Sequence, residues 1–229
     1  MLKWFVRLLD GTPSEEDTLA VREMTSRQWA TIADRTDTYL KGYTDKPGSE
    51  DRAQRRSEWI ARRFISLGGS SVLELGCGCG RNLAALKRRN PDIQVSGWDI
   101  NLKAIEQAKQ SVEGQFDVVN LYELVNSERK WDVIFTVGVL GHLESIAARD
   151  VILWALKHAN NNVVLVEEPG DWQVLKGPRG WGADKSTGDY VLWGHNFLDM
   201  IPEYSLVWSH ELPLDLCAPG ATVIYVLKP

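Results

Sequence analysis

Three glycines spaced two residues apart follow a short apolar stretch about a third of the way along the chain. The segment 72–82 reads VLELGCGCGRN, so Gly76, Gly78 and Gly80 stand between a strand-like run and a helical pattern. Glycine has no side chain and adopts backbone angles closed to other residues, so a ligand can lie directly against the main chain. The pattern predicts a nucleotide-binding turn between a strand and a helix.

The spacing of these glycines disagrees with two common nucleotide-binding turns. A dinucleotide fingerprint, Gly-x-Gly-x-x-Gly, would place its third glycine at Arg81 or at Leu83. A phosphate-binding loop requires Lys followed by Ser or Thr after its last glycine, where this chain has Arg81 and Asn82. ATP and GTP are therefore not the expected ligands.

The run E-x-G-x-G-x-G, which begins at Glu74, resembles motif I of the class I S-adenosylmethionine-dependent methyltransferases. The resemblance covers roughly residues 70–229 and implies S-adenosyl-L-methionine as the cofactor, with S-adenosyl-L-homocysteine as the product. In that family the acid at the position of Glu74 orders the turn near the methionine part of the cofactor. The cofactor contacts that the resemblance implies are Glu74, Gly76, Cys77, Gly78, Gly80, Asn82, Asp99, Ile100, Asn120, Leu121, Val137 and Gly138.

Two of these positions match later landmarks of the family. Asp99 ends the apolar run 94–98, where an acid is placed to accept hydrogen bonds from ribose hydroxyls. Asn120 follows a third strand-like run, where the family often has an Asp that contacts the adenine amine. Asn departs from that pattern but keeps the capacity to hydrogen-bond.

Apolar strand patterns alternate with helical patterns from residue 71 onward. Such alternation predicts an α/β fold, a Rossmann-like doubly wound sheet that is mostly parallel with helices on both faces. The last two apolar runs, 205–212 and 221–229, are joined by a Pro-Gly turn and predict an antiparallel C-terminal hairpin at the edge of the sheet. The expected strands are 71–75, 94–99, 116–120, 131–137 and 163–167. One helix is expected to start at residue 81, and two others are expected to span 102–111 and 144–158.

The chain is expected to divide into an N-terminal helical extension, residues 1–69, and a methyltransferase domain, residues 70–229. The extension would contain a helix over 14–36, capped by Ser14, and a second helix from Asp51 to Gly68. Relatives often fold such segments over the cofactor. Tyr39 and Tyr43, in the loop between the two helices, are therefore candidate cofactor contacts, with ordinary packing as the alternative.

A long glycine-rich segment, residues 169–194, leaves the sheet after the fifth predicted strand. Long loops inside compact domains usually serve function, so we expect a substrate lid here. Trp172, Trp181 and Trp193 would supply aromatic walls for an acceptor.

Methyl transfer from a sulfonium is an in-line displacement, which needs alignment, exclusion of water and, for a protonated acceptor, a base. His142 is the first candidate base because it follows the fourth predicted strand, although a His there is common in the family without a catalytic role. His195, Tyr190 and Glu168 are further candidates at or near the lid.

Motifs that the chain lacks restrict the acceptor. No Asp/Asn-Pro-Pro-Tyr/Phe follows the fourth strand, as it does in enzymes that methylate exocyclic amines of nucleic-acid bases. The end of that strand, 136–139, also lacks a carboxylate for magnesium, so no metal is expected. We predict transfer to oxygen or nitrogen of a small molecule. The alternatives are a protein or RNA methyltransferase that docks through the Arg-rich helix 52–63, and a non-catalytic S-adenosylmethionine-binding module.

The charge and the cysteine content of the chain restrict the binding partners and the cellular location that we expect for the protein. The net charge of −5 makes general attraction to nucleic acid unexpected. The pair Cys77 and Cys79 has neither zinc-finger spacing nor a second cysteine pair to complete four ligands, so the three cysteines of the chain are expected to be reduced. The apolar start, residues 1–9, is too short for a secretory signal, and no stretch is long enough for a membrane span. A cytoplasmic protein is expected, and the sequence carries no signal of oligomeric state.

Overall fold

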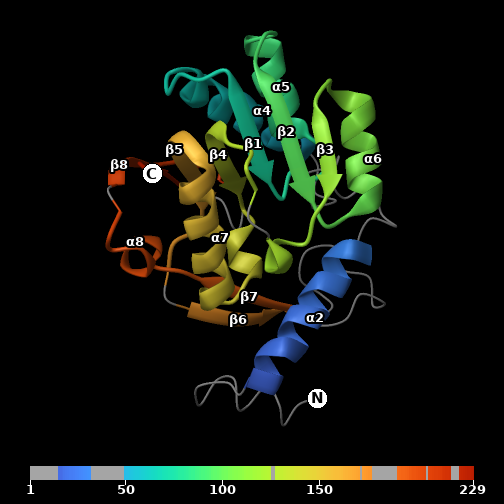
Figure 1. Ribbon diagram of the computed structural model, residues 1–229, viewed down its shortest axis with the longest axis vertical. Helices are drawn as coiled ribbons and strands as arrows, with labels where there is room; N and C mark the ends of the chain where they lie inside the picture. The colour runs from blue at the N-terminus through green and yellow to red at the C-terminus, as the bar shows by residue number, and fades with distance from the viewer. Residues whose placement is uncertain are drawn as a thin grey trace.

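A seven-stranded mixed sheet with the strand order β3-β2-β1-β4-β5-β9-β8 forms the centre of the molecule (Figure 1). The computed structural model describes residues 15–31, 49–124, 127–170, 172–176, 190–204, 206–217 and 222–229. The first five strands run parallel, and β9 pairs antiparallel with both β5 and β8. The strands of this sheet are β1 (Ser71–Leu75), β2 (Gln94–Asp99), β3 (Gln115–Val118), β4 (Trp131–Val137), β5 (Ala159–Glu167), β8 (Leu206–Glu211) and β9 (Val223–Leu227).

Successive side chains of the central strands enter two separate cores. Ile134 and Phe135 in β4 are both fully buried, yet Phe135 packs in the core on one face and Ile134 in the core on the other. Val163 and Val164 in β5 divide in the same way. This explains the nearly continuous apolar sequence of these strands, since a parallel sheet covered on both faces buries both sets of side chains.

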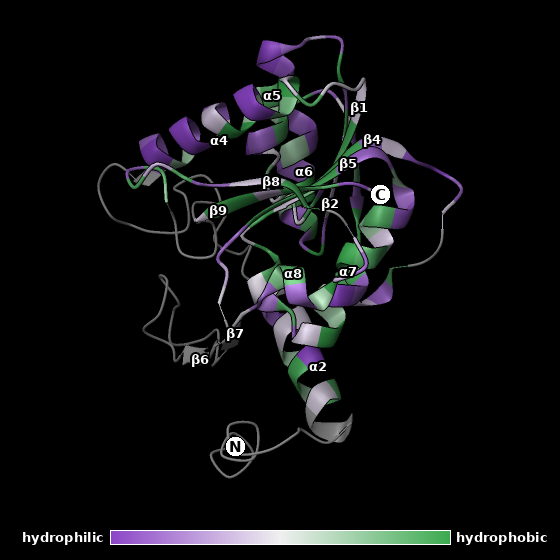
Figure 2. Cartoon of the chain, turned by 90° about the vertical axis from the view of Figure 1, so that its left-hand side faces the viewer, coloured by the Kyte–Doolittle hydropathy of each residue, from purple (hydrophilic) through white to green (hydrophobic). Residues whose placement is uncertain are grey.

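Helices cover both faces of the sheet (Figure 2). Apolar residues of α4, α5 and α6 join one core, and those of α7 and α8 join the other. The predicted doubly wound sheet with helices on both faces is therefore confirmed. The helices are α2 (Glu15–Thr31), α4 (Ser49–Ile65), α5 (Arg81–Arg89), α6 (Leu102–Ser111), α7 (Ser145–His158) and α8 (Phe197–Met200), with short 3₁₀ turns η2 (Leu121–Glu123) and η3 (Leu140–His142).

The predicted C-terminal hairpin is present, with β9 beside β5 and β8 at the edge. Several boundaries differ from the prediction; the third strand, for example, spans Gln115–Val118 rather than 116–120. The second helix begins at Ser49 rather than Asp51, so Asp51 lies inside the first turn, where its carboxylate accepts a hydrogen bond from Arg55 at 2.9 Å. The fifth strand begins at Ala159, four residues before the predicted start at 163 (163 − 159), because polar residues continue the pairing with β4.

The segment predicted as a lid loop contains a two-stranded antiparallel hairpin, β6 (Trp172–Lys176) and β7 (Tyr190–Gly194). Both stretches are rich in aromatic and β-branched residues, which favour strands: Trp172 and Val174 in β6, and Tyr190, Val191 and Trp193 in β7. Residues 177–189, with Trp181, lie outside the described residues, as do Ser14, Tyr39 and Tyr43. Figure 1 shows the hairpin and α2 at the edge of the sheet toward which the arrows of β1, β2 and β3 point.

Candidate cofactor site

The glycine turn after β1 depends on backbone conformations that favour glycine. Gly76, Gly78 and Gly80 have φ angles of 73°, 53° and 77°. A Cβ atom on Gly76 would lie 2.5 Å from a methyl carbon of Val139, so the turn also leaves no room for a side chain there. The amide nitrogens of Gly76 and Cys77 donate to the carbonyl oxygen of Trp98, at 2.7 and 2.9 Å. These bonds fix the turn against the end of β2.

Asp99 ties this turn to the following helix. One carboxylate oxygen accepts from the amide nitrogen of Gly78 at 2.8 Å, and the other accepts from the amide nitrogen of Asn101 at 2.9 Å. The side chain is 7% exposed, and burial raises the pKa of the carboxyl to about 6. Each carboxylate oxygen has a second lone pair, so these bonds leave acceptor capacity for a ligand hydroxyl.

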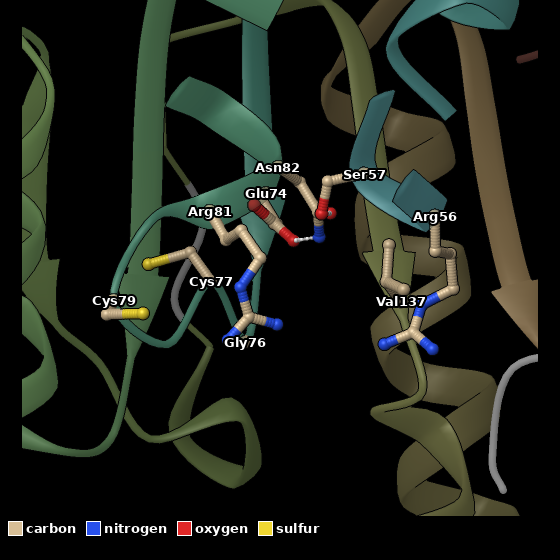
Figure 3. A pocket seen from close by; sticks show the side chains of 9 residues that line it. All are labelled: Arg56, Ser57, Glu74, Gly76, Cys77, Cys79, Arg81, Asn82 and Val137. Carbon is tan, nitrogen blue, oxygen red and sulfur yellow. Dashed lines mark hydrogen bonds between the residues drawn. The ribbon is translucent and has the colours of Figure 1, made fainter. Parts of the chain in front are cut away.

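A pocket opens beside the glycine turn (Figure 3). Five of its lining residues were predicted from the sequence: Glu74, Gly76, Cys77, Asn82 and Val137. Four were not predicted as site residues: Arg56, Ser57, Cys79 and Arg81. Cys79 and Arg81 lie directly beside predicted positions of the turn, and this placement could have identified them as pocket residues. Arg56 and Ser57 come from α4, and no spacing rule in the sequence connects them with the turn.

Glu74 supplies the carboxyl group of the pocket, and 1% of its surface is exposed. One carboxyl oxygen accepts a hydrogen bond from the Asn82 amide at 2.6 Å, and the Asn82 carbonyl oxygen accepts one from the Ser57 hydroxyl at 2.6 Å. The other oxygen of Glu74 has no hydrogen-bond partner among the described residues. Burial raises the pKa of Glu74 to about 8, so the carboxyl is protonated at neutral pH.

The side chain of Asn120 caps the turn η2 at the end of β3. Its carbonyl oxygen accepts from the amide nitrogen of Tyr122 at 3.2 Å, and its amide donates to Glu123 at 3.1 Å. The backbone keeps this region near Asp99, whose carbonyl oxygen accepts from the amide nitrogen of Val119 at 2.9 Å. Ile100, Leu121 and Asn120 therefore lie at the same sheet edge as Asp99 but outside the pocket of Figure 3.

Glu167, which the sequence did not single out, orders the loop after β4. Its buried carboxyl group accepts from the amide nitrogen of Val139 at 3.0 Å and from that of Leu140 at 3.1 Å. Gly138 begins this loop with a φ angle of 64°. Burial raises the pKa of Glu167 to about 8, against the opposing effect of the backbone hydrogen bonds. The neighbouring Glu168, which was predicted to line this edge of the sheet, follows the end of β5 and is half-buried.

His142 ends the turn η3 and lies under α2. The ring centroids of His142 and Trp29 are 4.4 Å apart in an edge-to-face arrangement, and the carbonyl oxygen of Trp29 accepts from the Asn101 amide at 2.9 Å. Arg22, which also lies on α2, forms an ion pair with Glu144, with 2.5 Å between the charged atoms. Burial lowers the pKa of His142 to about 4, so its imidazole is neutral at pH 7. Part of the N-terminal extension thus covers the carboxyl edge of the sheet.

His195 holds the same loop from the side of β7. Its Nε2 atom lies 3.1 Å from the carbonyl oxygen of Leu140 and 2.9 Å from that of Leu143, so the ring donates from Nε2. Burial lowers the pKa of His195, which keeps the ring neutral. Of Tyr190 only the backbone is described, within β7. His142 therefore lies in the loop after β4, and His195 holds that loop through its backbone.

The part of the chain with described coordinates holds no group of three or more His, Cys, Asp or Glu side chains arranged to bind a metal ion. Within that same part, no helix combines the length and apolarity required to cross a bilayer.

One family of known proteins matches the centre of the chain. Residues 73–163 match the family described as "Methyltransferase domain". This region is therefore similar to a methyltransferase domain. The structure of magnesium protoporphyrin IX methyltransferase from Synechocystis PCC 6803, which contains bound S-adenosylmethionine, superposes with a TM-score of 0.64 at 15% identity, over 91% of this chain and 97% of that one. At this identity the likeness concerns the fold.

Two curated relatives match parts of this chain. Ribosomal RNA small subunit methyltransferase C of Hahella chejuensis is 35% identical over 74 residues, which cover 32% of this chain and 22% of the relative. O-methyltransferase resE of Aspergillus sclerotiorum is 23% identical over 114 residues, which cover 45% of this chain and 43% of the relative. The chain thus spans less than half the length of either relative.

Proposed function

We propose that this protein is an S-adenosylmethionine-dependent methyltransferase that transfers a methyl group to oxygen or nitrogen of a small molecule. The observation that carries the proposal is the glycine turn, which Asp99 holds open beside a pocket containing Glu74, inside a methyltransferase domain. The turn leaves the backbone accessible because Gly76, Gly78 and Gly80 have no side chains.

The residues of the site fit an S-adenosylmethionine cofactor. A buried carboxyl oxygen of Glu74 has no described protein partner, and the Cβ position of Gly76 is bounded by Val139. Asp99 has lone pairs for ribose hydroxyls at the end of β2. When bound, the cofactor supplies an activated methyl group on a sulfonium. The chain's own groups have to align the acceptor and exclude water.

The acceptor would lie between the loop after β4, the hairpin β6–β7 and α2. Two side chains hold this loop through hydrogen bonds to its backbone. Glu167, at the end of β5, accepts from Leu140, and His195, directly after β7, donates to Leu143. The neutral imidazole of His142 can accept a proton from an acceptor that arrives protonated. No carboxylate stands at the end of β4, so the proposed reaction is independent of a metal.

The names of similar proteins support a small acceptor. One structural neighbour is a magnesium protoporphyrin IX methyltransferase, and one relative is an O-methyltransferase. A second candidate acceptor, RNA, is favoured by the match to a ribosomal RNA methyltransferase and by the exposed arginines of α4, among them Arg52, Arg62 and Arg63. The net charge of −5 favours the small acceptor.

Transfer of a labelled methyl group tests the proposal. Purified protein would be incubated with methyl-labelled S-adenosylmethionine and separate pools of small hydroxyl and amine compounds, total RNA and total protein. The proposal expects label in a small-molecule pool, with no loss of rate in the presence of a chelator. Label in RNA alone, sensitive to salt, would support the second candidate. Binding of S-adenosylhomocysteine without transfer to any pool would support a non-catalytic module.

A further inference from the structure

Helices α4 and α5 concentrate the positive charge of the chain. α4 has five arginines and three acids, and α5 has four basic residues and no acid. The two helices thus carry a net charge of +6, namely +2 on α4 and +4 on α5, whereas the whole chain carries −5. The remaining residues together carry −11. Figure 2 shows the two helices next to each other on one side of the sheet.

The outer surface of α4 combines cations with an aromatic ring and an apolar side chain. The guanidinium group of Arg63 lies over the Trp59 ring, 4.9 Å from its centroid, and Ile65 is 45% exposed. The opposite side of the helix, with Ile60 and Phe64, is buried in the core. The basic face, as we call this surface, contains the exposed arginines of both helices: Arg52, Arg55, Arg62, Arg63, Arg88 and Arg89.

Acids of the chain neutralise only part of the basic face. Glu58 pairs with Arg88 at 2.7 Å and with Arg89 at 2.9 Å, which joins α4 to α5. Within the described part of the chain, no acid forms an ion pair with Arg62 or Arg63. Their positive charge is therefore available to a partner molecule.

Helix dipoles explain only part of this distribution of charge. Cations are stabilised at the carboxyl end of a helix, where Arg62 and Arg63 lie in the last turn of α4. Arg52 lies instead in the first turn of α4, where the dipole disfavours a cation. The stability of the helix alone therefore does not account for the basic face.

We propose that the basic face binds the acidic surface of a partner protein. Arginine pairs with carboxylates through two parallel hydrogen bonds, and Arg and Trp are the residue types enriched at the centres of protein interfaces. Ile65, beside these cations, offers an apolar contact that a phosphate backbone would not use. This interaction goes beyond the proposed function, because it requires neither cofactor nor methyl transfer.

The charge of the rest of the chain favours a protein over a nucleic acid. A nucleic acid is an extended polyanion, so it would reach beyond α4 and α5 and meet residues whose net charge is −11. An acidic patch on a folded partner would contact the basic face alone. The complementary charges would then attract without this repulsion.

Fluorescence anisotropy with a labelled acidic peptide tests the basic face. The probe is a helical peptide of about 18 residues with glutamates three and four residues apart and one leucine among them. We expect binding that weakens with salt, because exposed charges are screened. Single-stranded RNA of equal net charge is the comparison and should bind at least about tenfold more weakly.

Two pairs of charge reversals locate the binding surface. Arg62→Glu combined with Arg63→Glu should weaken peptide binding by about tenfold or more, because attraction becomes repulsion. Lys109→Glu combined with Lys130→Glu is the matched control, since both lysines are exposed outside α4 and α5 and the net charge changes equally. The control should change peptide affinity by about twofold or less. Melting temperatures of both variants check that the fold is retained.

Four outcomes would overturn the proposal. They are no binding of the peptide, equal loss of affinity in the two variants, RNA binding as tight as peptide binding, and self-association that the Arg62 and Arg63 reversals abolish. The third outcome would assign the basic face to nucleic acid, and the fourth would assign it to a second copy of this chain. The titrations contain no cofactor, so failure of the proposed methyl transfer would leave their result unchanged.

Discussion

The Asp99 carboxylate accepts a hydrogen bond from the amide nitrogen of Gly78, with 2.8 Å between the two atoms. This bond joins the carboxyl end of β2 to the middle of the glycine turn that follows β1. The second oxygen of Asp99 accepts from Asn101 at the start of α6. One buried side chain thus connects three elements at the point where the proposed cofactor lies.

Replacement of Asp99 by Asn should weaken cofactor binding. Asn has nearly the same volume but retains one acceptor oxygen in place of two, so either the turn or the helix start loses its partner. We expect at least a tenfold rise in the dissociation constant for S-adenosylhomocysteine, which corresponds to about 1.4 kcal/mol. Asp117→Asn, an exposed position on β3, is the control. An unchanged affinity in Asp99→Asn would show that this carboxylate is dispensable.

Loss of the Glu167 carboxylate should destabilise the whole protein. Glu167→Ala leaves the buried amide groups of Val139 and Leu140 without acceptors, at a cost of about 1–3 kcal/mol each. For a domain of this size the melting temperature should fall by about 2–4 °C per kcal/mol. Thermal unfolding checks this, with Glu168→Gln as a neighbour expected to change stability by about 0.5 kcal/mol or less. Equal melting temperatures for Glu167→Ala and wild type would contradict the role assigned to Glu167.

Stability should decrease as the pH rises from about 4.5 to about 8. Burial raises the pKa of Glu74 and of Glu167 from 4.5 to about 8, so the folded state binds more protons than the unfolded state in this range. The free energy of unfolding therefore falls with increasing pH, and their stabilising contribution is lost as the pH passes the folded-state pKa. Urea unfolding at about pH 6 and about pH 8.5 measures the slope. Glu74→Gln, which cannot ionise, should flatten it; an equally steep slope in that variant would refute the assignment.

His142 should act as a neutral base whose pKa depends on Trp29. The two rings touch, and burial lowers the pKa of His142 to about 4. Trp29→Ala should expose the imidazole and raise its pKa toward 6.5, which nuclear magnetic resonance titration can follow among the four histidines of the chain. His142→Ala should lower turnover without weakening S-adenosylhomocysteine. Unchanged turnover would remove His142 as the base.

Sequence patterns identified those parts of the fold that repeat a known local geometry. The glycine turn could be predicted because Gly76, Gly78 and Gly80 need φ angles that other residues avoid. The strands β1, β2 and β4 could be predicted because burial on both faces requires continuous apolar runs. Asp99 could be predicted from its place at the end of β2.

Contacts between distant segments could not be predicted in the same way. Arg56 reaches the pocket because α4 packs on α5, and Glu167 reaches the loop after β4 because β5 lies beside β4 in register. The adjacent residues Glu167 and Glu168 are of the same type, so the sequence did not show which one is buried. The end of the strand separates them, since Glu167 is the last residue of β5 and is 1% exposed, whereas Glu168 follows the strand and is half-buried.

Calorimetric titration of the wild-type protein with S-adenosylhomocysteine, with ATP as the comparison ligand, measures whether the glycine turn binds this cofactor. We expect a one-site isotherm with a micromolar dissociation constant for S-adenosylhomocysteine and no heat of binding for ATP, whose loop signature the chain lacks. Absence of binding by folded protein, or equal binding of both ligands, would contradict the assignment of the glycine turn to this cofactor.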